Sequence, residues 1–107
     1  MKQITPKDLS AWLADASRAK PTLLDVREAW EYETCSIQGS RLIPMGEITR
    51  RVAELDPQAP VVVICHHGGR SMQVAGYLAQ QGFSSVHNLT GGVDAWARNV
   101  DSAMPVY

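Results

Sequence analysis

The chain has 107 residues, of which 45% are hydrophobic, which is enough for one continuous core but not for two. The sequence therefore predicts a single domain spanning residues 1–107. Lysine and arginine (10) nearly balance aspartate and glutamate (11), so the formal net charge is -1. This balance argues against nucleic acid or an anionic membrane as a partner, because both require a basic surface.

The opening segment is charged rather than apolar, and no apolar run approaches the length needed to span a bilayer. We therefore expect a cytoplasmic protein with no membrane partner. The only two cysteines, Cys35 and Cys65, lie far apart in the sequence. In a reducing compartment, thiol chemistry is a better expectation for them than a structural disulfide.

Apolar spacing and single Gly and Pro residues predict strands that alternate with helices. The first helix should begin with Thr5 as its capping residue and Pro6 in its first turn. Further helices are expected over residues 28–33, 47–55, 72–81 and 93–98, and strands over 22–24, 41–43, 61–64 and 86–89. Gly82 directly follows the helix predicted over residues 72–81, in the position where glycine commonly ends a helix.

The run Val-Val-Val-Ile at residues 61–64 is apolar without alternation, as in a strand buried on both faces. Together with the alternating elements, it predicts an α/β fold, a doubly wound and mostly parallel sheet with helices on both faces. In such folds the ligand site lies beyond the carboxyl ends of the strands.

The segment that follows this strand occupies that position. It consists of Cys65, His66, His67, Gly68, Gly69, Arg70 and Ser71. The glycines allow the backbone to curl so that successive amides converge, and a following helix adds its positive end. Such a loop binds an anion, and a thiolate placed in it is stabilised as a nucleophile. The alternative is that Cys65 merely continues the apolar strand.

The other loop residues are predicted to bind substrate. Arg70 could attract an anionic donor to the rim, or could be a charge that faces solvent. His66 and His67 could add positive charge at low pH, or face outward while their amides bind. Ser71 is a candidate cap for the next helix.

Two groups of motifs resemble the signatures of the rhodanese family. The first group comprises residues 23–28 (Leu-Leu-Asp-Val-Arg-Glu), Glu31-Tyr32, residues 37–40 and Ile43-Pro44. The second comprises residues 62–65, the loop through Ser71, Leu78, Gly82-Phe83, residues 89–92 and Ala95-Trp96. The tail, Pro105-Val106-Tyr107 included, is similar to the end of rhodanese domains fused to ubiquitin-activating-like enzymes.

The resemblance implies a sulfurtransferase of the thiosulfate:cyanide type. Cys65 would take a sulfane sulfur from thiosulfate or a similar anion, hold it as a persulfide, and pass it to a nucleophile such as cyanide in vitro. It implies no cofactor, and as a partner a thioredoxin-like or sulfur-carrier protein acceptor.

Two other functions remain open from the sequence. A cysteine phosphatase or arsenate reductase uses a related loop, but with five residues between cysteine and arginine, whereas four separate Cys65 from Arg70. A rhodanese-like module could instead be non-catalytic, or only relay sulfur with a partner protein.

Three residue groups near these motifs are expected to have smaller roles. No metal site is predicted, because the consecutive Cys65, His66 and His67 side chains cannot converge on one tetrahedral ion. Cys35 could be a resolving thiol, but a partly buried thiol is the better expectation. Asp25 and Arg27 are predicted to tie loops together rather than to react.

Overall fold

The computed structural model describes residues 1–107, and its centre is a five-stranded sheet in which every pair of neighbouring strands is parallel. The order of the strands is β1-β5-β4-β2-β3. Their bounds are β1 (Lys2–Ile4), β2 (Thr22–Asp25), β3 (Arg41–Leu42), β4 (Val61–Ile64) and β5 (Val86–Leu89).

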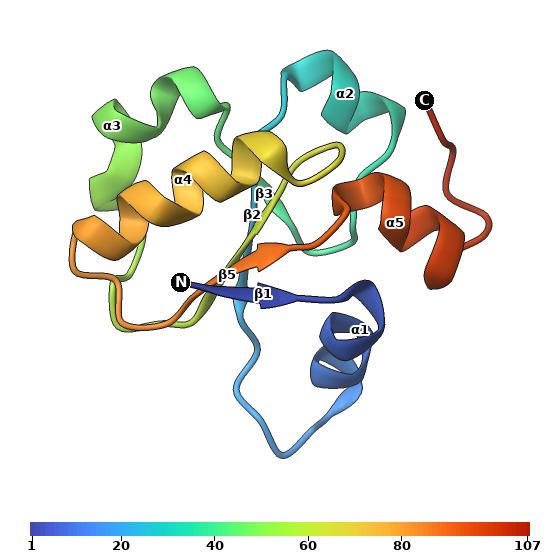
Figure 1. The fold of residues 1–107 in the computed structure, drawn as a ribbon, viewed down its shortest axis with the longest axis horizontal. Coiled ribbons are helices and arrows are strands. Elements are labelled where there is room, and N and C mark those ends of the chain that lie inside the picture. Colours follow the sequence, from blue (N-terminus) through green and yellow to red (C-terminus); the bar gives the residue numbers. More distant parts are fainter.

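Helices cover both faces of this sheet, as Figure 1 shows. They are α1 (Pro6–Ala14), α2 (Ala29–Thr34), α3 (Ile48–Arg51), α4 (Gly69–Gln80) and α5 (Gly92–Asn99), with 3₁₀ turns η1 (Met45–Glu47) and η2 (Val52–Glu54). The predicted α/β class and parallel sheet are confirmed. None of these helices has the length and apolar character needed to cross a membrane.

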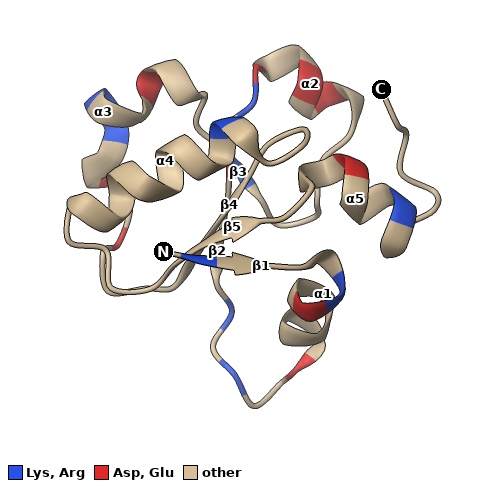
Figure 2. Ribbon diagram, in the orientation of Figure 1, with Lys and Arg blue, Asp and Glu red and all other residues tan.

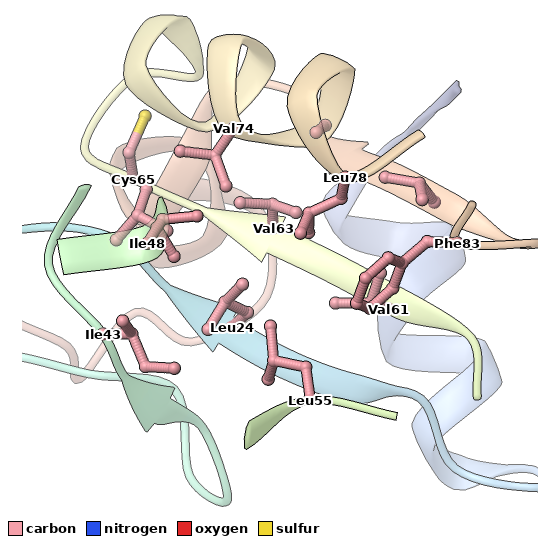
Figure 3. Close-up of a cluster of buried hydrophobic side chains, with 13 residues drawn as sticks. Leu24, Ile43, Ile48, Leu55, Val61, Val63, Cys65, Val74, Leu78 and Phe83 are labelled. Carbon is pink, nitrogen blue, oxygen red and sulfur yellow. The ribbon is translucent and has the colours of Figure 1, made fainter. Parts of the chain in front are cut away.

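The central strand β4 divides the core into two clusters. Val61 and Val63 belong to the cluster under α3 and α4, and Val62 and Ile64 to the one under α1 and α5. All four side chains are buried, which explains the absence of alternation in this strand. Cys65 continues the first cluster, and Figure 3 shows it at one end, with its sulfur directed away from the other labelled side chains.

Acidic and basic residues are distributed over most of the helices, without one strongly charged face, as Figure 2 shows. The near-zero net charge is therefore not the sum of two large opposed patches. Any anion that binds this protein must be held by local groups rather than by a general surface potential.

Three elements differ from the predictions. β1 was not predicted, because its residues are mostly polar and exposed, and it is a strand only through pairing with β5. The helix predicted over 47–55 is divided into η1, α3 and η2. α4 begins at Gly69, three residues early, because Gly68 adopts a left-handed φ of 107° that turns the chain directly into the helix.

Candidate active site

The loop of residues 65–71 surrounds a single buried sulfur. Cys65 follows β4 directly and is only 1% exposed. Its Sγ accepts a hydrogen bond from the backbone N–H of Gly68 at 3.1 Å and lies 3.2 Å from Oγ of Ser71. The amides of Gly69, Arg70 and Ser71, in the first turn of α4, have no acceptor within the chain. The loop therefore offers unpaired donors beside the sulfur.

Ser71 connects this sulfur to a series of hydrogen-bonded polar side chains that extends over the neighbouring strands β5 and β1. Its hydroxyl donates to Oδ1 of Asn88 in β5, and Asn88 Nδ2 donates to Gly68 O (3.3 Å) and to Gln3 Oε1 (2.9 Å). The prediction that Ser71 caps the helix is wrong, since Gly68 is the N-cap residue and Ser71 is fully buried inside α4. Ser71 instead fixes the position of the sulfur.

The start of α5 holds the loop backbone from the other side. The amide of Val93 donates to Cys65 O at 2.9 Å, and that of Asp94 donates to His66 O at 3.1 Å. At Gly92 a Cβ atom would lie only 2.2 Å from Cys65 O, and φ is 60°. Only glycine permits this close approach, so the loop is held between α4 and α5 by the backbone itself.

Arg70 does not extend freely toward solvent. Its guanidinium forms a bidentate ion pair with Glu31 of α2, with distances of 2.6 and 2.8 Å. The hydrogen bonds from Arg70 lower the pKa of Glu31 to about 2. The charge of Arg70 is therefore largely balanced by a carboxylate that neither alternative for this residue included, and its attraction of an anionic donor stays a prediction.

Tyr107 packs over the same group of residues. Its hydroxyl accepts from Arg27 Nη1 (2.9 Å) and donates to Glu31 Oε2 (2.7 Å), and burial raises its pKa to about 12. Its ring stacks on His66 with 3.9 Å between centroids, and His67 stacks on the other side of His66 at the same distance. His67 is exposed as predicted, whereas His66 is half-buried.

The pair of Asp25 and Arg27 lies beneath the site. Both side chains are fully buried and form an ion pair at 2.8 Å. Arg27 also donates to Cys35 O (2.7 Å) and Glu31 O (3.2 Å). This geometry agrees with the expectation that the pair ties loops together: it joins the end of β2 to both ends of the segment 31–35.

Cys35 is more buried than predicted, at 8% exposure. Its side chain belongs to the core cluster on the α1 and α5 face, whereas Cys65 belongs to the cluster on the α3 and α4 face. Both cysteines are free thiols. Because the sheet lies between the two clusters, this arrangement does not support a resolving role for Cys35.

The widest surface hollow, of about 700 Å³, lies between α1, α5 and residues 36–39 and includes no loop residue. A smaller hollow of about 290 Å³ is lined by His67, Gly68, Gly69 and Met72, together with Asn88. The smaller hollow is the one that matters for the candidate site, because loop residues line it and the wider one has none.

Four residues that shape the site were not predicted to have a role in it: Glu31, Asn88, Asp94 and Tyr107. A polar asparagine inside the otherwise buried strand 86–89 was an available signal for Asn88. Glu31 and Tyr107 were named only as parts of motifs, and no local signal indicated their contacts or those of Asp94, because these contacts are with residues distant in the sequence.

The ion pair of Glu31 predicts a dependence of stability on pH. Because the pKa of Glu31 falls from 4.5 to about 2 on folding, its contribution is complete above pH 4.5 and is lost as the pH falls toward 2. We expect Glu31→Gln to lower the free energy of unfolding by about 2 kcal/mol at neutral pH, Arg70 being partly exposed.

Urea unfolding of both proteins between pH 7 and 2 measures this difference, which should shrink below pH 4.5. Glu54→Gln, which removes an exposed carboxylate, is the matched control and should change stability little. A difference between wild type and Glu31→Gln that stays constant down to pH 2 would contradict the prediction.

A parallel α/β sheet with a cysteine loop at the carboxyl end of its central strand defines a class of domain built around one buried thiol. Residues 5–99 match the family model described as "Rhodanese-like domain". The chain therefore belongs to the rhodanese-like family, as its motifs indicated.

Relatives and solved structures agree with this assignment. The chain is 42% identical over 89 residues to the Rhodanese-like/PpiC domain-containing protein 12, chloroplastic, of Arabidopsis thaliana, a match that covers 79% of this chain but only 30% of that longer protein. It is 40% identical to thiosulfate sulfurtransferase GlpE of Pseudomonas paraeruginosa, over 69% of this chain and 67% of the relative. A rhodanese-like domain protein from Staphylococcus aureus superposes with a TM-score of 0.84 at 28% identity, covering 100% of this chain and 99% of that one.

Proposed function

We propose that this protein is a sulfurtransferase in which Cys65 carries a sulfane sulfur as a persulfide. The observation that supports this most is the hydrogen bond from the Gly68 amide to Cys65 Sγ at 3.1 Å, beside three amides without acceptors. A persulfide on Cys65 would extend its terminal sulfur into this group of donors, which stabilise the negative charge that collects there. The family assignment supports the same chemistry.

The reaction proceeds in two displacements with thiosulfate as donor. The Cys65 thiolate attacks the outer sulfur of thiosulfate, the sulfur–sulfur bond of the donor breaks, and sulfite leaves with the electron pair. A nucleophilic acceptor, such as cyanide in vitro, then attacks the outer sulfur of the persulfide, and the thiolate of Cys65 returns as leaving group. No oxidant or cofactor is needed for this cycle.

Binding of the donor would depend on backbone groups more than on side-chain charge. Arg70 is paired with Glu31, so its attraction for a dianion is reduced, whereas the loop amides and the start of α4 are free. The name of the Pseudomonas relative, thiosulfate sulfurtransferase, supports thiosulfate as one donor.

A small protein thiol, of a thioredoxin-like or sulfur-carrier kind, is a candidate acceptor. Trp30 is 61% exposed beside Tyr107, and Met72, which follows Ser71, is 45% exposed. Exposed aromatic and methionine side chains at the edge of a site are typical anchors for a partner surface.

We also propose that this chemistry takes place in the cytoplasm, where a reducing environment keeps Cys65 a free thiol.

Intact mass measurement of the purified protein tests the proposal. After incubation with thiosulfate, we expect a gain of about one sulfur atom, removed by dithiothreitol because thiol exchange is reversible. Cys35→Ser is the matched control and should gain the same mass. Absence of any gain in the wild type, or its loss in Cys35→Ser, would contradict the assignment to Cys65.

A further inference from the structure

Three potential metal ligands meet beside the loop: His66, His67 and Asp94. One ligand atom from each lies within 4.8 Å of the other two. The prediction that there is no metal site rested on the consecutive side chains of the loop alone. The structure adds a carboxylate from the first turn of α5, which approaches the two imidazoles from a different element.

The backbone holds these elements together in advance of any ligand. The Asp94 amide donates to His66 O at 3.1 Å, and Gly92 permits the close approach of α5 to the loop. The ring of His66 is fixed between those of His67 and Tyr107. His66 and the backbone of Asp94 are thus held in place, and only the His67 side chain has to move when an ion binds, which limits the loss of conformational entropy.

Two of the donor atoms have no competing hydrogen bond. Nε2 of His66 is buried and has no hydrogen-bond partner, which is unusual for a buried polar atom. Arg98 occupies only Oδ2 of Asp94, at 3.0 Å, so Oδ1 remains available. His67 is exposed, so its side chain is free to rotate out of the stack with His66 when an ion about 2.1 Å from each ligand binds.

We propose that His66, His67 and Asp94 form a binding site for a divalent transition metal ion, with Zn²⁺ as the best-suited cation. Two imidazole nitrogens and one carboxylate oxygen form a donor set typical of zinc, and water completes the tetrahedron. The site is distinct from the sulfur of Cys65, which is buried and lies against the Gly68 amide and the Ser71 hydroxyl.

Isothermal titration of Zn²⁺ into the Cys65→Ser protein tests this site, because removing the loop sulfur excludes binding to the thiolate. We expect one ion per chain. In the same background, His67→Gln and Asp94→Asn should each weaken binding by about tenfold or more. His87→Gln removes the one remaining histidine of the chain, in β5, and should leave the affinity unchanged.

Co²⁺ provides a second readout with the same proteins. Its visible spectrum should be that of a nitrogen and oxygen site, without a thiolate charge-transfer band. The proposal is overturned if Cys65→Ser shows no saturable binding, if His67→Gln and Asp94→Asn retain the parent affinity, or if His87→Gln loses it. Since these proteins lack Cys65, none of these outcomes depends on sulfur transfer.

Discussion

Cys65→Ser is expected to abolish transfer of sulfur from thiosulfate to cyanide, with a rate reduced roughly a thousandfold or more. Serine is close to cysteine in size, but its hydroxyl is not ionised at neutral pH and forms no persulfide. The hydrogen bonds from the Gly68 amide and to Ser71 are compatible with an oxygen atom, so the fold should be retained.

Steady-state assays of thiocyanate formation measure this effect, with circular dichroism to verify folding. Cys35→Ser serves as control because it removes the only other thiol, in the opposite core cluster, and its activity should remain within a few-fold of the wild type. If Cys65→Ser kept substantial activity while folded, the loop would not contain the nucleophile.

Arg27→Met is expected to have the largest effect on stability, a loss of about 3–5 kcal/mol in the free energy of unfolding. The substitution leaves the carboxylate of Asp25 buried without its ion-pair partner. It also removes the donors to Cys35 O, Glu31 O and Tyr107 Oη, which connect β2, the segment 31–35 and the C-terminal residue.

Urea unfolding at neutral pH gives this value. The matched control is Arg41→Met, which breaks an ion pair with Glu54 in which both side chains are about half exposed; it should cost less than about 1 kcal/mol. Comparable losses for Arg27→Met and Arg41→Met would show that burial of the ion pair between Asp25 and Arg27 does not affect stability.

Replacing Asp25 and Arg27 together by apolar residues should lower the free energy of unfolding by less than the sum of the losses from the two single changes.

The sequence predicted a candidate nucleophile at the end of the central strand because the signals for the strand and the loop are local. A run of four apolar residues indicates the central strand. The cysteine follows this run directly, and the two glycines lie only a few residues further along the chain. The capping pattern of Thr5 and Pro6 is local in the same way, and the structure confirms it with a hydrogen bond from the Asp8 amide to Thr5 Oγ1. The alternation of elements then predicted the parallel sheet.

Only the tertiary structure decided the state of the charges around the loop. Glu31 and Arg70 are far apart in the sequence, and so are Tyr107 and His66, Asn88 and Ser71, and Asp94 and His67. Hydrophobic periodicity determines which face of an element is buried but not which polar side chains from separate elements meet at the sheet edge. The sequence by itself therefore determined the fold and the candidate nucleophile, whereas the pairing of Arg70 and the cluster around His66 follow from the packing of α2, α4, α5 and the C-terminal residue.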